Sequence, residues 1–303
     1  MSIIEIRGLH KRFNGVEAVS GLDLDVEEGE IYGFLGPNGA GKTTTIRIMI
    51  GLIDPDQGTV EISGRNVREH GSSVRREIGY LPEKVSFYGN LSVEENMEFL
   101  CEMKRCPKDM IDGLLHEFEL EEHRRKKSKH LSKGMTQRLG IAQTLIGDPD
   151  ILILDEPTAG LDPNIRRWVK KKINSLKDQG KTIFLSSHVL SEVQELCERV
   201  GVLNEGKMLA EDMVDSLGEK FALKDRLEFK VEPIGEAFDM LEKLDYVERP
   251  RLFKGNLVLY CKGERKVDVI RELIDGGFDI HDFHVKEPDL EEVFVRLTDG
   301  GRG

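Results

Sequence analysis

Hydrophobic and polar residues form short patterned runs along the N-terminal part of the chain. The stretch Leu22–Val26 alternates with a period of two, which predicts a half-exposed strand. The apolar run Ile31–Leu35 predicts a buried strand, and a helix is expected from Lys42 to about Ile50. A further strand, Gly58–Ile62, follows the turn residues Asp54–Asp56. This part of the chain therefore alternates strands and helices.

The middle of the chain has helical spacing instead. The segment Ser92–Glu95 has the Ser-x-x-Glu form of a capping box, and apolar residues recur at helical spacing after it. Further helices are expected over Met110–Phe118 and from Ser132 to Ile146. We interpret this block, about residues 86–147, as a helical lobe inserted into an α/β domain.

The α/β pattern then resumes. The runs Ile151–Leu154 and Thr182–Leu185 predict strands, and Asp162-Pro163 predicts the start of a helix. The segments Val200–Leu203 and Lys207–Ala210 predict a closing hairpin. We therefore place one domain over residues 1–218.

A second domain is expected over residues 219–303, because a new series of elements begins there. Their predicted order is strand, helix, strand, strand, helix, strand, which is the ferredoxin-like signature. A last helix is expected over Leu290–Leu297. The earlier elements are Leu227–Val231, Ile234–Leu244, Val247–Phe253, Leu257–Cys261, Lys266–Ile274 and Phe278–Val285.

Composition narrows the classes of partner. The net charge of −12 over 303 residues argues against binding to nucleic acid, and the basic run at 124–129 is interpreted as a solvated surface segment. No stretch reaches the roughly 20 apolar residues of a membrane helix, which predicts a cytosolic chain. The four cysteines are scattered, as free thiols of a reducing compartment would be.

A glycine-rich loop, Gly36–Thr43, fits the pattern G-x-x-x-x-G-K-[ST] between a predicted strand and a predicted helix. Its backbone N–H groups and the helix N-terminus would bind phosphate oxygens, Lys42 would reach the β- and γ-phosphates, and Thr43 would hold Mg²⁺. The chemistry points to ATP with Mg²⁺. The predicted nucleotide-binding residues here are Gly36, Pro37, Asn38, Gly39, Ala40, Gly41, Lys42, Thr43 and Thr44.

Two acids follow the apolar strand Ile151–Leu154. Asp155 is predicted to bind Mg²⁺ beside the glycine-rich loop. Glu156 is predicted to act as the general base on the water that attacks the γ-phosphate. Together with Lys42 as a catalytic group, they predict ATP hydrolysis.

The segment Leu131–Arg138, LSKGMTQR, resembles the signature motif of ATP-binding cassette (ABC) ATPases. The resemblance extends from Ile3 to about Leu217. Ala159–Asp162 resembles the D-loop, and His188 resembles the switch histidine, a catalytic residue. The resemblance implies an α/β fold of the P-loop NTPase class, ABC type, with an antiparallel β subdomain and the inserted helical lobe, followed by the small α+β domain.

The same resemblance implies further ligand contacts. Phe13 is similar to the aromatic residue that stacks on adenine, and Glu83 stands where the family has a metal-binding glutamine. Ser132 and Gly134 would contact ATP held by a second copy of the chain, as in a head-to-tail dimer. Departures at Glu83, Lys133 and Met135 are interpreted as subfamily features.

The resemblance favours a transport motor: an ATP-binding subunit that works with a separate integral membrane permease. The tail Glu287–Phe294 is similar to that of multidrug, sodium and antibiotic exporter ATPases. We therefore expect a homodimer on the inner face of the cell membrane. The alternative is a soluble ABC-type ATPase acting in translation or DNA repair. A P-loop kinase acting on a small molecule would have no use for the signature helix.

Overall fold

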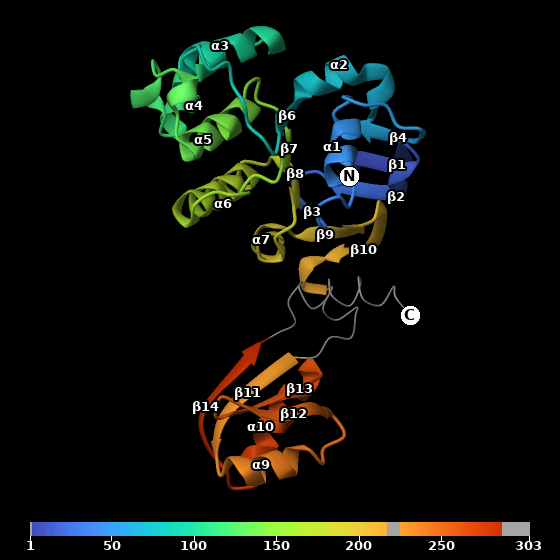
Figure 1. Cartoon of the computed structure of the whole chain (residues 1–303), viewed down its shortest axis with the longest axis vertical. Helices are drawn as coiled ribbons and strands as arrows, with labels where there is room; N and C mark the ends of the chain where they lie inside the picture. Colours follow the sequence, from blue (N-terminus) through green and yellow to red (C-terminus); the bar gives the residue numbers. More distant parts are fainter. Residues whose placement is uncertain (1, 217–224, 287–303) are drawn as a thin grey trace. The chain divides into compact units, whose positions relative to one another are not determined.

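The computed structural model describes residues 2–216 and 225–286 (Figure 1). The chain divides into two compact units between Met213 and Val214. The predicted helix Leu290–Leu297 and the tail Glu287–Phe294 lie outside the described residues. Within residues 2–216 and 225–286, no helix has the length and apolar character needed to cross a membrane.

A six-stranded sheet forms the centre of the N-terminal unit. Its order is β10-β9-β3-β8-β7-β6, parallel except that β10 runs antiparallel to β9. All residues of β3, β7 and β8 are buried, which accounts for the apolar runs in the sequence. The bounds are β3 (Ile31–Leu35), β6 (Ile78–Leu81), β7 (Ile151–Asp155), β8 (Thr182–Ser187), β9 (Arg199–Asn204) and β10 (Lys207–Met213).

A second, antiparallel sheet shares the core of this unit. Its order is β2-β1-β4-β5, and it supplies Ile4, Ile6 and Leu24 to the same hydrophobic cluster as Phe34 of β3. Repeated register shifts along β1 and β2 interrupt the period of two, so the sequence predicts only a fragment of β2. The bounds are β1 (Ser2–Phe13), β2 (Val16–Glu27), β4 (Gln57–Ile62) and β5 (Arg65–Asn66).

The helical block forms a lobe of its own. Figure 1 shows α3, α4 and α5 grouped on the side of the unit away from β1, β2 and β4. The Ser92 hydroxyl and the Glu95 carboxylate make the predicted capping box at the start of α3. The bounds are α3 (Val93–Lys104), α4 (Met110–Glu117), α5 (Lys133–Thr144) and two 3₁₀ turns, η1 (Glu121–His123) and η2 (Ser128–His130).

Four further helices complete the N-terminal unit. Asp162 accepts hydrogen bonds from the backbone N–H groups of Asn164 and Ile165, and Pro163 takes the first position of α6, as predicted. The helix α2 is absent from the sequence prediction because only Val67 and Val74 of it are buried, and it bends at His70. The bounds are α1 (Lys42–Met49), α2 (Val67–Glu77), α6 (Pro163–Asp178) and α7 (Leu190–Leu196).

Over residues 225–286, the C-terminal unit is a four-stranded antiparallel sheet with two α-helices. The strand order β12-β13-β11-β14 and the element order match the ferredoxin-like prediction. Leu227 and Phe229 of the sheet pack with Leu241 of α9 and Leu273 of α10 in one core. The bounds are β11 (Asp225–Glu232), α9 (Ile234–Leu241), β12 (Val247–Phe253), β13 (Asn256–Cys261), η3 (Gly263–Arg265), α10 (Lys266–Asp275) and β14 (Asp279–Lys286).

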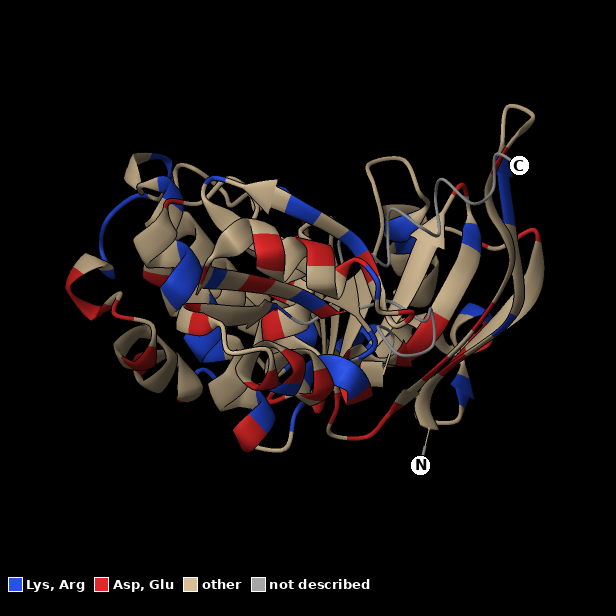
Figure 2. Ribbon diagram, turned by 90° about the horizontal axis from the view of Figure 1, so that it is seen from below, with Lys and Arg blue, Asp and Glu red and all other residues tan. Residues whose placement is uncertain are grey.

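Charged residues of both signs are mixed along the chain. In the view of Figure 2, Lys and Arg positions lie among Asp and Glu positions. Two members of the basic run at 124–129 are ion-paired: Arg124 with Glu94 and Asp112, and Lys127 with Glu95. These pairs agree with the interpretation of the run as ordinary surface.

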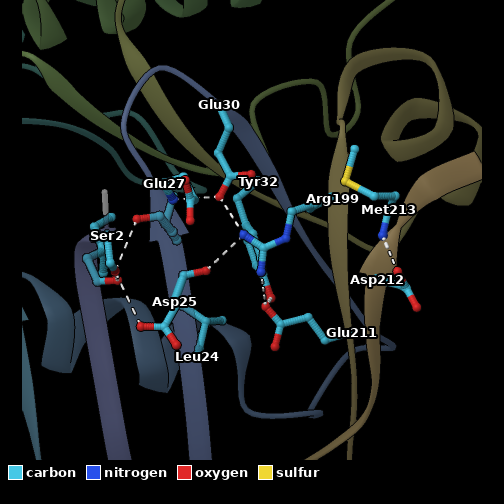
Figure 3. A network of polar contacts seen from close by, with 12 residues as sticks. Ser2, Leu24, Asp25, Glu27, Glu30, Tyr32, Arg199, Glu211, Asp212 and Met213 are labelled. Atoms are coloured by element: carbon cyan, nitrogen blue, oxygen red, sulfur yellow. Dashed lines mark hydrogen bonds and ion pairs between the residues drawn. The ribbon is translucent and has the colours of Figure 1, made fainter. Parts of the chain in front are cut away.

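A polar network ties β3 to β9 and β10 (Figure 3). One guanidinium nitrogen of Arg199 donates to Glu30 at 2.8 Å, and another donates to Glu211 at 2.8 Å. The buried Tyr32 hydroxyl also donates to Glu211, at 3.0 Å. Burial raises the pKa of Glu30 and of Glu211. Glu30 immediately precedes β3, so the network lies at the opposite end of that strand from the glycine-rich loop.

Candidate nucleotide site

A cavity of about 370 Å³ opens where β3, β7 and β8 end. Parallel strands bring their carboxyl ends to one edge of a sheet, so the loops that follow them converge. The cavity collects ten of the residues predicted from the sequence, together with Ala18 and Ala159. The ten are Pro37, Asn38, Gly39, Gly41, Lys42, Thr43, Thr44, Glu83, Glu156 and His188.

The loop after β3 needs glycine at two positions for steric reasons. A Cβ at Gly36 would lie 2.4 Å from the backbone oxygen of Leu203. A Cβ at Gly41 would lie 2.4 Å from the backbone oxygen of Ala18, and Gly41 also has a φ of 108°. The loop is therefore wedged between β2 and β9, with its backbone held where the helix α1 begins.

Lys42 is buried and directed back into this loop. Its Nζ donates to the backbone oxygen of Gly36 at 2.6 Å and to that of Pro37 at 3.3 Å. The same Nζ lies 3.3 Å from Oε1 of Glu156. One ammonium group thus connects the loop after β3 to the acid after β7.

Glu156 occupies a sharp turn at the end of β7. Its φ is 51°, a left-handed conformation that is rare for a side chain of this size. Its N–H donates to the backbone oxygen and the hydroxyl of Ser186, at 3.2 and 3.0 Å. Its Oε2 lies 2.7 Å from Nδ1 of His188. The turn therefore holds the carboxylate between Lys42 and His188.

Asp155 lies behind Glu156 with no exposed surface. Its Oδ1 accepts a hydrogen bond from the Ser186 hydroxyl at 2.6 Å, whereas its buried Oδ2 has no hydrogen-bond partner. Burial raises the pKa of Asp155, an effect that the Ser186 hydrogen bond and the nearby Thr43 hydroxyl oppose. An unmatched carboxylate oxygen next to a threonine hydroxyl is a donor set that suits Mg²⁺.

Glu83 lines the cavity from the loop that follows β6. Tyr80, in β6, lies near the same acids: burial raises its pKa to about 12, with further contributions from Asp155 and Glu83. Glu83, Glu156 and Lys42 therefore line the cavity, and Asp155 and Tyr80 lie near these acids without lining it.

Six predicted residues do not line this cavity. Gly36, Ala40 and Asp155 are next in sequence to residues that do, and the other three are Phe13, Ser132 and Gly134. Phe13, at the end of β1, is 45% exposed, and its ring lies 5.4 Å from Nζ of Lys11. Ser132 caps α5 by accepting from the N–H of Met135 at 3.2 Å, and Gly134 packs against Ile165 of α6.

The start of α5 is joined to the segment that follows β7. Nζ of Lys133 donates to the backbone oxygen of Gly160 at 2.5 Å, and Nε2 of Gln137 donates to that of Pro157 at 2.5 Å. Lys133, an unexplained departure in the sequence, therefore has a structural partner within the same chain.

Sequence reasoning missed Ser186, which contacts both acids of the site. Its hydroxyl donates to Asp155 and accepts from the N–H of Glu156. The available signal was its place in Ser186-Ser187-His188, directly after a buried strand. A polar residue at the buried end of such a strand must find a partner, and the neighbouring strand ends in Asp155.

Residues 19–159 match the family described as ABC transporter. Over 99% of its length, the chain is 36% identical to the bacitracin transport ATP-binding protein BcrA of Bacillus licheniformis, of which it covers 98%. It is 37% identical over 98% of its length to the Nod factor export ATP-binding protein I of Ralstonia nicotianae, of which it covers 94%.

Among solved structures, the fold is similar to a dimeric post-hydrolysis state of the ATP-binding cassette MJ0796 bound to ADP and phosphate. The TM-score is 0.64 with 25% identity, covering 69% of this chain and 98% of that one. Full-length similarity to the curated relatives, the family match and the geometry of the site agree. The chain therefore belongs to the ABC transporter family, as an ATP-binding, ATP-hydrolysing subunit of its exporter-like branch.

Proposed function

We propose that this chain is the motor subunit of an exporter, in which ATP-driven pairing of two copies moves a separate membrane-spanning partner. The observation that carries the proposal is its similarity, over 99% of its length, to a bacitracin transport ATP-binding protein. The name of the Nod factor export relative supports the outward direction. Such a motor works on the cytoplasmic, inner face of the cell membrane.

ATP would lie in the cavity after β3, with its phosphates on the loop Gly36–Thr43 and on Thr44. Lys42 stabilises charge on the β- and γ-phosphates. Glu156 accepts the proton of the attacking water, and His188, 2.7 Å from its Oε2, orients the carboxylate. Ala40, buried beneath the loop, supports its backbone.

The residues present fit a Mg²⁺ ion. The buried Oδ2 of Asp155 has no hydrogen-bond partner, and the hydroxyl of Thr43 and the carboxylate of Glu83 lie at the same site. Mg²⁺, when bound, neutralises charge on the β- and γ-phosphate oxygens. Thr43, Glu83 and Asp155 would hold it together with the nucleotide.

The site would be completed by a second copy of the chain. Ser132 is exposed at the start of α5, where backbone N–H groups and the helix dipole favour an anion, and Gly134 is the second residue of this helix. Because neither residue lines the cavity of its own chain, we assign them to the ATP of the other copy. Phe13 would stack on adenine at the open side.

The membrane partner would dock beside the helical lobe. A groove of about 360 Å³ is lined there by Phe87, Tyr88, Asn96 and Phe99. The rings of Tyr88 and Phe99 meet edge to face at 5.0 Å, and Tyr88 is 56% exposed. An exposed aromatic surface of this kind suits a short helix that presents an apolar anchor to it.

The test is to purify the tagged chain from detergent-solubilised membranes and identify the proteins that accompany it. We expect one integral membrane protein, retained by the wild type and lost from Tyr88→Ala. Leu52→Ala, at an equally exposed apolar position outside the groove, is the matched control and should retain the partner. Recovery of ribosomes or DNA instead of a membrane protein would overturn the motor proposal.

A further inference from the structure

The C-terminal unit has two sheet edges of different character. The edge strand β12 contains Pro250 and a positive φ at Arg249, and its register with β13 shifts at this point. Such features discourage the addition of another strand. The opposite edge strand, β14, is eight residues long and contains no proline. Among the strands of residues 225–286, β14 pairs only with β11.

The regular part of β14 is Asp282–Lys286. The register with β11 shifts between Ile280 and Asp282, and from Asp282 to Lys286 it continues without interruption. Phe283 and Val285 point to the face covered by α10: their β11 partners, Phe229 and Leu227, are core residues. Phe283 stacks on Phe229 at 6.2 Å yet remains 47% exposed.

The helix α10 also has exposed apolar residues. It buries Val269 and Leu273 against the sheet, while Val267 and Ile274 are 60% and 61% exposed. An edge strand whose core-side residues remain exposed is a surface to which a further strand can pair. Any such partner would cover Phe283 and Val285.

The sequence of the regular segment is complementary to itself. An antiparallel pair of two β14 strands centred on His284 places Val285 opposite Phe283 of the second copy, and the reverse, on the apolar face. On the other face it places Lys286 opposite Asp282 of the second copy, twice. Directly opposed apolar residues and opposite charges both stabilise antiparallel pairs.

The charges on β11 agree with this register. Within one chain, Lys286 lies opposite Arg226 and Asp282 lies opposite Lys230. In the paired arrangement, Arg226 and Lys286 of one copy would be followed across the junction by Asp282 and Lys230 of the second copy. The acid would then lie between two basic residues. Arg226 is ion-paired with Glu228 of its own strand, and the Asp282 of the second copy would lie directly beside Lys286.

We propose that β14 pairs with β14 of a second copy, in an antiparallel register centred on His284, and joins the two C-terminal units into one eight-stranded sheet. The interface is isologous, as a two-fold dimer requires. It uses neither the nucleotide cavity nor α5, so it forms without nucleotide. A single strand pair is a small interface, and its occupancy rises when two copies are already held together by a shared partner.

The first test places a cysteine on the two-fold axis. His284→Cys in a Cys106→Ser background should form a disulfide-linked dimer of the full chain under mild oxidation, in the absence of nucleotide. Among the described residues the remaining cysteines are buried. His281→Cys, exposed on the same strand, is the matched control and should cross-link several-fold less, because its copies would lie far apart. Equal cross-linking of the two variants, or none at position 284, overturns the proposal.

The second test reverses charges. In the His284→Cys background, Asp282→Lys or Lys286→Asp alone should reduce cross-linking several-fold, and the double exchange should restore it. Loss of cross-linking that the double exchange fails to restore rules out this register. Far-UV circular dichroism checks that each variant is folded. Because no nucleotide is present, this result is independent of whether ATP pairs the cassettes, which is measured separately with Glu156→Gln.

Discussion

Carboxylates are buried at both ends of the central sheet, but the two ends differ in the partners that these carboxylates have. At the start of β3, Glu30 and Glu211 share the guanidinium of Arg199, and the Tyr32 hydroxyl adds a further hydrogen bond. At the ends of β7 and β8, Asp155 leaves Oδ2 without a hydrogen bond. Burial raises the pKa of carboxyl groups at both ends, so burial alone does not distinguish them.

The difference lies in what completes each cluster. At the start of β3 the chain itself supplies the cation, and the result is a structural joint between β3, β9 and β10. At the other end Oδ2 of Asp155 has no hydrogen-bond partner, and in the proposed function Mg²⁺ that arrives with ATP would complete the cluster. An acid left incomplete at the carboxyl edge of a parallel sheet is therefore the stronger indicator of function.

The largest expected effect is on ATP turnover, when a carboxylate is removed from one end of the sheet and then from the other. Glu156→Gln should lower ATP turnover by at least about 100-fold, because a general base contributes that much. The mutant should still bind ATP and dimerise. Glu30→Gln, at the other end of β3, should leave turnover within a factor of about two. Phosphate release and light scattering at saturating ATP measure both properties, and a monomeric Glu156→Gln would count against the composite site.

The next largest effect is on stability, and it tests the ion pairs of Arg199 with Glu30 and Glu211. Arg199→Met should lower the free energy of unfolding by about 3 kcal/mol at neutral pH, because it leaves buried carboxylates without their cation. The pKa values of Glu30 and Glu211 lie above their ordinary range in the folded chain. Stability lost at neutral pH should thus be regained as pH falls toward the ordinary glutamate range, where the folded state takes up protons first.

Urea unfolding at neutral and mildly acidic pH measures the free energy of unfolding of Arg199→Met. Lys207→Met, at an exposed cation of β10, should change stability by no more than about 0.5 kcal/mol. A deficit in Arg199→Met that grows as pH falls would mean that the carboxylates are held by something other than Arg199.

The smallest expected effect is an increase, not a decrease, in the free energy of unfolding. Asp155→Asn should raise the unfolding free energy of the chain by about 1 kcal/mol when neither metal nor nucleotide is present, because a buried charge with an unmatched oxygen is removed. The same variant should lose Mg²⁺-dependent nucleotide binding. Asp150→Asn, at an exposed neighbouring acid, serves as the control. A loss of stability in Asp155→Asn would mean that Asp155 has a structural role, as Glu30 and Glu211 do.

Much of the fold was predictable because buried strands and capped helices carry local signals. The runs Ile31–Leu35 and Ile151–Leu154, the capping box at Ser92 and the proline at position 163 all have a local physical cause. The strand β1 was missed because its bulges break the period of two. The helix α2 was missed because it buries too few residues to show a periodic face.

For the site, motif spacing predicted which residues lie close together but not the hydrogen bonds that connect them. Lys42, Glu83, Glu156 and His188 line one cavity, and their roles there stay a prediction. The contacts of Ser186 with both acids, and of Lys133 with Gly160, depend on neighbouring strands and helices that no local pattern records.

The contacts of Lys42 join the glycine-rich loop to Glu156 in a way that phosphate binding would change. Its ammonium group is bound to the oxygens of Gly36 and Pro37 and lies 3.3 Å from Glu156. In the proposed function, phosphate oxygens on this loop would compete for the three protons of Lys42. Phosphate binding and the release of Glu156 from the lysine would then be one event, so that the base becomes available only when ATP is bound.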